Sequence, residues 1–178
     1  MSAANADDGS TTPFYVGAGI GHVSVDRGGI SLSSANGGYI NGTGTAVSVE
    51  GGYYFTDHFG VELGYHDYGK PTAYFQPGIS TLNKCPASFS CPQVSGMTAE
   101  LLGSVELVPL VDGVLRLGVL EWNVGSPGSM LIGKTSGNAF IYGVGVRRHL
   151  DDGVSLDITY ERSNFTTEET RIGVSYSF

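Results

Sequence analysis

The chain has 178 residues, 28 of them glycine, and a formal net charge of −8 at pH 7. This acidic balance argues against nucleic acid as a partner, because phosphate binding needs a basic face. Charged residues make up only 15% of the chain, well below the roughly 25% that is usual in soluble domains. No stretch reaches the roughly 18 apolar residues of a membrane helix, but this limit does not exclude a membrane β-barrel.

The chain begins with the small and polar residues MSAANADDGS, which contain no apolar signal-peptide core. We interpret this start as a mature N-terminus behind an initiator Met, with the signal peptide removed. We expect residues 1–12 to be flexible and residues 13–178 to form a single barrel domain.

Apolar and polar residues alternate along the chain with the period of two that predicts β-strands. In chain order the strands are predicted at 13–26, 45–55, 59–68, 97–110, 114–122, 139–150, 154–161 and 169–178. Tight turns are predicted near 56–58, 111–113 and 151–153, and longer loops near 27–43, 69–95, 123–138 and 162–168. Short turns that alternate with longer loops are typical of an up-and-down outer-membrane barrel.

The loop near 69–95 contains both cysteines of the chain, Cys85 and Cys91, in the sequence CPASFSC. Two cysteines so close together favour a small disulfide loop formed in an oxidising compartment over two free thiols. A metal site there is not expected, since no third or fourth soft ligand lies nearby.

The two faces of the predicted strands differ in chemistry. One face is almost purely Val, Leu, Ile, Phe and Tyr, and the other combines Gly, Ser and Thr with charges of both signs. We predict that the apolar face meets lipid and that the charges pair inside the narrow barrel, where unpaired charge would be costly. The predicted lumen charges are Glu50, Glu62, Glu100, Glu106, Asp157 and Glu161 with Arg116, Arg147 and Arg171.

The chain ends in RIGVSYSF, an amphipathic strand that can close the barrel by pairing with the first strand. This ending resembles the C-terminal signature of bacterial outer-membrane proteins, with an aromatic residue, Tyr176, third from the end and a terminal Phe178. The resemblance implies that the barrel-assembly machinery reads these two residues.

Residues 13–178 resemble the OmpA-like transmembrane-domain superfamily of small eight-stranded barrels. The resemblance rests on FYVGAGIGHV, GGYYFTDHFGVELGYHDYG, GVGVRRHL and the final RIGVSYSF. It implies an all-β, eight-stranded, antiparallel transmembrane β-barrel. It also implies a place in the bacterial outer membrane, among lipid and lipopolysaccharide. We expect a monomer without cofactors.

For function, the sequence favours a structural or surface-interaction role, with an extracellular ligand bound by the loops. One alternative is a narrow ion pore gated by interior Arg–carboxylate pairs. Another is a membrane-embedded lipid-modifying enzyme, because His22 and Ser24 share a strand face, as a Ser–His nucleophile pair requires. The lipid-A deacylases that carry His-x-Ser have it on a later strand, so no enzyme is predicted. A soluble lipocalin-like carrier would instead place Glu50, Glu100 and Arg116 outside.

Overall fold

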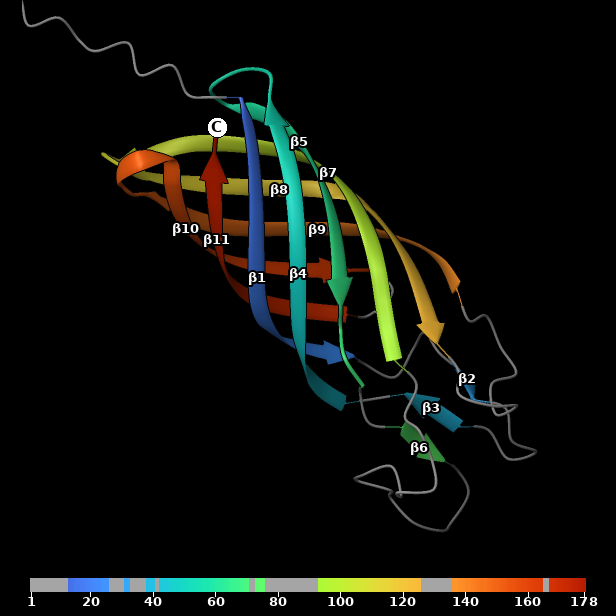
Figure 1. The fold of residues 1–178 in the computed structure, drawn as a ribbon. Coiled ribbons are helices and arrows are strands. Elements are labelled where there is room, and N and C mark those ends of the chain that lie inside the picture. The colour runs from blue at the N-terminus through green and yellow to red at the C-terminus, as the bar shows by residue number, and fades with distance from the viewer. Residues whose placement is uncertain are drawn as a thin grey trace, which may run out of the picture.

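The computed structural model describes residues 13–25, 31–32, 38–40, 42–70, 73–75, 93–125, 136–164 and 167–178. Eight antiparallel strands close into a barrel in the order β1-β11-β10-β9-β8-β7-β5-β4 (Figure 1). Their bounds are β1 Phe14–Val25, β4 Gly42–Tyr54, β5 Phe59–Asp67, β7 Gln93–Val108, β8 Val111–Gly125, β9 Ser136–His149, β10 Val154–Ser163 and β11 Thr167–Ser177. The predicted fold class is therefore confirmed. None of the described residues forms a helix long and apolar enough to cross a membrane.

The first and last strands close the barrel against each other. Strand β1 pairs with β11 from Tyr15–Ser177 to Val25–Thr167, and on its other side it pairs with β4. The amide of the last residue, Phe178, donates a hydrogen bond to the carbonyl oxygen of Phe14 at 3.0 Å. The terminal strand is thus held on both sides, and the barrel has no free edge.

Short connections join the strands at one end of the barrel, which we call the turn end, and the C-terminus lies there too (Figure 1). The predictions near 56–58 and 151–153 are confirmed by a bend and by the short 3-10 helix η1, Asp151–Gly153. The prediction of a turn at 111–113 is wrong, because these residues already belong to β8. The turn falls at Pro109 and Leu110, and Leu110 has the φ of 68° that the third residue of a type II turn needs after proline.

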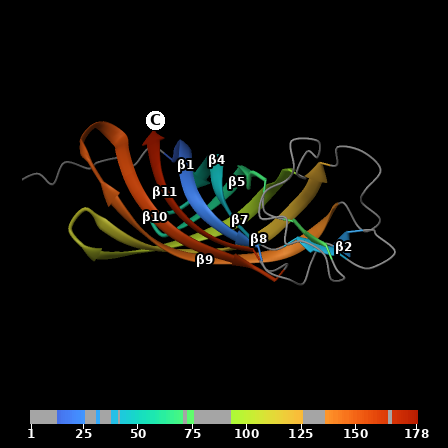
Figure 2. The same cartoon turned by 90° about the horizontal axis from the view of Figure 1, so that it is seen from below.

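The opposite end, which we call the loop end, contains more strand than predicted. Strands β4, β7, β8 and β9 each extend three or four residues past the predicted bounds on this side. A separate three-stranded sheet in the order β2-β3-β6 also lies here, formed by β2 Ser31–Leu32, β3 Gly38–Ile40 and β6 Ala73–Phe75 (Figure 2). Since β6 falls within the segment 69–95, that segment is not entirely a loop as predicted. The sheet joins the first long connection to the second.

The outer face of the barrel is apolar over most of its height. Leu63, Leu101, Val119 and Ile158 are among many large apolar side chains that are mostly exposed there. Nearer the loop end the outward positions become polar: Thr43, Thr45, His22, Glu121, Asn123, Asn138 and Thr170 are exposed. This apolar outer face, which we call the belt, gives way to polar residues at the loop end, as is typical of a membrane barrel. The strands continue past the belt on the loop side. The soluble-carrier alternative is contradicted, because Glu50, Glu100 and Arg116 are buried inside.

Candidate functional site

Arg116 of β8 lies at the centre of the lumen and is almost completely buried. Its Nη1 donates a hydrogen bond to Glu62 Oε1 of β5. The guanidinium also lies 3.7 Å from Glu161, 3.9 Å from Glu100 and 4.0 Å from Glu50. One cation therefore faces carboxylates from four other strands, as expected where an eight-stranded interior is filled by side chains.

Arg171 of β11 is the second centre of this network. Its Nη2 lies 3.0 Å from Glu50 Oε2 and 3.2 Å from Glu161 Oε1, and its Nη1 donates to Ser48 Oγ at 3.1 Å. Glu50 and Glu161 thus lie between the two guanidiniums and link them. We call Arg116, Arg171, Glu50, Glu62, Glu100 and Glu161 the ion-pair network.

Two tyrosines, Tyr15 and Tyr54, border the network on the side of the turn end. The Tyr15 hydroxyl donates to Glu62 Oε2. Arg147 Nη1 donates to the Tyr54 hydroxyl at 2.6 Å, and its guanidinium lies over the rings of Tyr15 and Tyr54 at 5.2 and 5.9 Å from the ring centres. Arg147 is therefore held by aromatic contacts.

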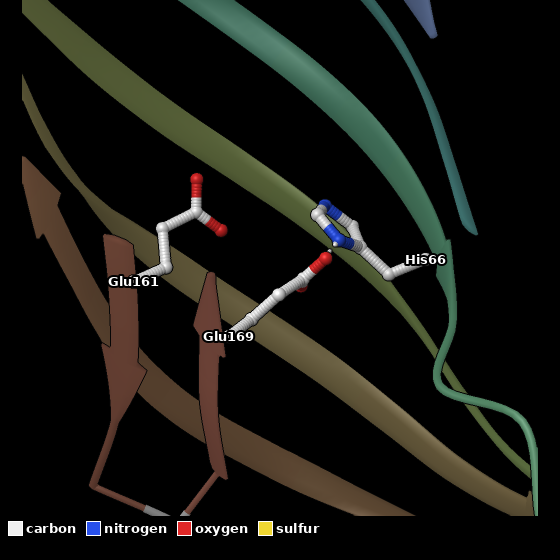
Figure 3. Close-up of side chains that lie close together, drawn as sticks. All are labelled: His66, Glu161 and Glu169. Carbon is white, nitrogen blue, oxygen red and sulfur yellow. Dashed lines mark hydrogen bonds and ion pairs between the residues drawn. The ribbon is translucent and has the colours of Figure 1, made fainter. Parts of the chain in front are cut away.

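On the loop side of the network, His66 of β5 lies near two carboxylates, Glu161 of β10 and Glu169 of β11. His66 Nδ1 lies 3.2 Å from Glu169 Oε2, and His66 Nε2 lies 3.4 Å from the hydroxyl of Thr98. Glu161 extends into the same part of the lumen (Figure 3). Within the described part of the chain, one ligand atom of His66, one of Glu161 and one of Glu169 lie within 4.8 Å of one another.

Closer to the loop end, the lumen is filled by apolar side chains. The neighbouring inward positions of five strands, with Tyr68 directly after β5, form a buried cluster that we call the apolar cap. Its members are Val23, Val25, Ala46, Tyr68, Val94, Leu120, Trp122, Val124, Ala139 and Ile141. The cap and the ion-pair network form two successive layers of packed side chains in the lumen. On the side of β10 and β11 the layer of the cap is completed by the buried polar side chains of Ser163 and Thr167.

At the turn end the lumen opens into a cavity of about 490 Å³. Asp112, His149 and Ser155 line it in a chain of hydrogen bonds: His149 Nε2 lies 2.9 Å from Asp112 Oδ2, and His149 Nδ1 lies 3.1 Å from Ser155 Oγ. These contacts join the ends of β8, β9 and β10. We call this cavity the vestibule.

The structure brings most of the predicted lumen charges together. Arg147 and Asp157 are buried in the lumen beside the network, but no ion pair between described residues includes either of them. Glu106 does not join the network, because it lies exposed near the turn at Pro109, beyond the buried part of β7. Glu106 lies on the face of β7 that the alternation predicts to be inward, but this part of β7 extends beyond the packed interior.

Two buried residues were missed as members of the charged interior, Glu169 and His66. The alternation contains the signal for both, since Glu169 is two residues from Arg171 and His66 is four residues from Glu62. The sequence analysis also did not predict the apolar cap. Leu120 and Trp122 lie four and six residues after Arg116, so the alternation places them on the same inward face.

The other predicted sites lie away from the lumen or outside the described part. Tyr176 and Phe178 are exposed at the turn end, where the Phe178 ring stacks with Phe14 and with Tyr176 at 6.4 Å between centres. His22 and Ser24 share the outer face of β1 near the loop end, as predicted. Cys85 and Cys91 fall outside the described residues, so their disulfide stays a prediction.

The family profile described as "Outer membrane protein beta-barrel domain" matches residues 1–178. Similar solved structures include Neisserial surface protein A, at 20% identity over 93% of this chain and 97% of that chain, with a TM-score of 0.61. OprG of Pseudomonas aeruginosa has 12% identity, coverage of 94% and 97%, and a TM-score of 0.63. The N-terminal barrel of Pseudomonas aeruginosa OprF has 12% identity, coverage of 94% and 98%, and a TM-score of 0.55. No curated protein sequence matches the chain.

Proposed function

Because the chain belongs to the outer membrane protein β-barrel domain family, we propose that it is a monomeric scaffold of the bacterial outer membrane whose loop end contacts an extracellular ligand. Its location is the outer membrane, where lipid and lipopolysaccharide surround the belt. The role of the loop end is the proposed part.

The packing of the lumen is the observation that supports this proposal. A conducting pore needs a continuous polar path, and here the side chains of the ion-pair network and of the apolar cap are buried in successive layers. With the interior filled, the groups left to act on other molecules lie at the two ends of the barrel. The loop end has more additional structure than the turn end, since its strands extend past the belt and it bears the sheet β2-β3-β6.

The similar structure from Neisseria supports the same direction, since its name describes a surface protein. The ion-pair network then serves as a structural core that fills the barrel, and a gating role is not needed. We also propose that Tyr176 and Phe178, exposed beside the pairing of β1 with β11, are the residues read by the assembly machinery.

Labelling of single cysteines on living cells tests the orientation that this function requires. In a background with Cys85→Ser and Cys91→Ser, Asn123→Cys places a thiol at the loop end and Asp57→Cys places one at the turn end, both at exposed positions. We expect a membrane-impermeant maleimide to label Asn123→Cys in intact cells, and Asp57→Cys only after the outer membrane is permeabilised. Labelling of Asp57→Cys alone in intact cells would overturn the proposal, because the loop end would then face the periplasm.

A further inference from the structure

The cluster of His66, Glu161 and Glu169 has free acceptor capacity deep inside the barrel. The three side chains come from β5, β10 and β11, and each is at least 96% buried, with exposed fractions of 1%, 3% and 4%. Each carboxylate has one engaged oxygen: Glu161 Oε1 accepts from Arg171 Nη2, and Glu169 Oε2 lies beside His66 Nδ1. The other oxygens, Glu161 Oε2 and Glu169 Oε1, are buried without a hydrogen-bond partner among the described residues.

Such atoms are rare, because a buried polar atom normally has a partner in the protein, an ordered water or an ion. Two of them next to one imidazole indicate a missing positive partner.

The charge balance of the lumen points the same way. The buried carboxylates outnumber the buried guanidiniums: Glu50, Glu62, Glu100, Asp157, Glu161 and Glu169 face only Arg116, Arg147 and Arg171. Excess negative charge in a low-dielectric interior is strongly unfavourable unless a cation or bound protons compensate it. A bound divalent cation would supply positive charge beside two of the buried oxygens that lack a partner; the others belong to Glu50, Glu100 and Asp157.

We propose that His66, Glu169 and Glu161 bind a divalent first-row transition-metal ion, with Zn²⁺ as the best match. One imidazole and two carboxylates suit such an ion, whereas Ca²⁺ and Mg²⁺ prefer oxygen ligands alone. At zinc–ligand bonds of about 2.0–2.2 Å, two ligand atoms on one tetrahedral ion lie roughly 3.3 Å apart. His66 Nδ1 and Glu169 Oε2 lie 3.2 Å apart, in contact with each other, and this separation is also compatible with two ligands of one ion.

Glu161 completes the site by a small rotation of its side chain. The three ligand atoms, one from each residue, lie within 4.8 Å of one another. A shift of the Glu161 carboxylate by about 1.5 Å brings all three to the spacing of one zinc ion. Glu161 Oε1 stays with Arg171 while Oε2 turns to the ion, and an ion ligated in this way keeps one position for a water. The Thr98 hydroxyl lies 3.4 Å from Nε2, the other nitrogen of the His66 ring.

Among the described residues, packed side chains flank the site on both sides. Tyr68 stacks on His66 at 5.6 Å between ring centres and belongs to the apolar cap, and the ion-pair network lies on the other side. The ion is therefore captured while the strands close and is retained against chelators afterwards.

The test is to fold the denatured chain into detergent micelles with Zn²⁺ present, pass the folded protein over a chelating column and measure zinc by mass spectrometry. We expect about one zinc per folded wild-type chain, since the ligand set forms one site. His66→Gln and Glu169→Gln should each lower zinc retention roughly tenfold or more. The control His22→Gln removes an exposed histidine of the outer face and should retain zinc like the wild type.

Folding with Co²⁺ gives a second readout that does not depend on the stability of the variants. We expect visible ligand-field absorption from the wild type and from His22→Gln, and no such bands when the chain folds with Mg²⁺. Wild-type protein that leaves the chelating column with no more zinc than His66→Gln, or that shows no cobalt bands, would overturn the proposal. The excess carboxylates would then be neutralised by protons.

Discussion

Arg171 and Glu50 form an ion pair across strand β1, with 3.0 Å between Nη2 and Oε2. Arg171 belongs to β11 and Glu50 to β4, and β1 lies between these two strands in the barrel. The pair can meet because β1 presents glycines beneath it: a Cβ atom on Gly17 would lie 3.0 Å from Glu50 Cγ, and one on Gly19 would lie 2.6 Å from Arg171 Cδ. The glycines of β1 therefore provide the space in which the charges pair.

Gly19→Val should lower stability, because its side chain would take the space of the Arg171 side chain. We expect the free energy of unfolding to fall by about 1–3 kcal/mol, as for other overpacked interiors. Urea titration in micelles, followed by the unboiled and boiled gel mobility, measures the change. Gly51→Val is the matched control, since a Cβ there would meet only the Tyr15 carbonyl oxygen, at 3.7 Å. Equal losses in both variants would contradict the packing argument.

Glu62→Gln should be among the most harmful conservative substitutions in the chain. Glu62 accepts hydrogen bonds from both Arg116 and Tyr15 in the buried interior. Removing one member of a buried ion pair leaves the other charge uncompensated, at a cost of about 3–5 kcal/mol. The same urea titration measures this loss. The control is Glu106→Gln, which removes a carboxylate at an exposed position and should stay within about 0.5 kcal/mol of the wild type. A neutral Glu62→Gln would mean that the network is not a structural core.

Arginine substitutions on the outer face of β8 should locate the edge of the membrane. Leu117 lies in the apolar belt, and Glu121 lies four residues nearer the loop end on the same face. We expect Leu117→Arg to destabilise the barrel in lipid by about 2–4 kcal/mol and Glu121→Arg by about 0–1 kcal/mol. Folding titrations in phospholipid vesicles provide both values. Similar losses of stability at both positions would mean that the bilayer extends nearer to the loop end than the belt indicates.

The alternation of side chains made the fold predictable, because a period of two assigns each residue of a strand to one face. This alternation correctly places Arg116, Arg171, Glu50 and Glu62 inside. It did not define where a strand stops facing packed neighbours, so Glu106 was assigned to the lumen.

Two other differences arise from contacts that no local pattern contains. Asp112 and Gly113 form a turn signal, yet Pro109 and Leu110 make the turn, because the register of β7 with β8 pairs Glu106 with Asp112. The apolar cap depends on which inward positions lie at one height in the barrel, and this height follows from the stagger of all eight strands.

The central claim is that the lumen is a sealed core, and planar-bilayer recording tests it most directly. Wild-type barrel, folded and confirmed by its gel mobility, should insert without conductance steps, because the apolar cap and the ion-pair network block the path. The double variant Arg116→Ala/Trp122→Ala, which thins both layers, should show conductance steps. Regular conductance steps from the folded wild type, absent from a heat-unfolded sample, would contradict the account and make the barrel a pore.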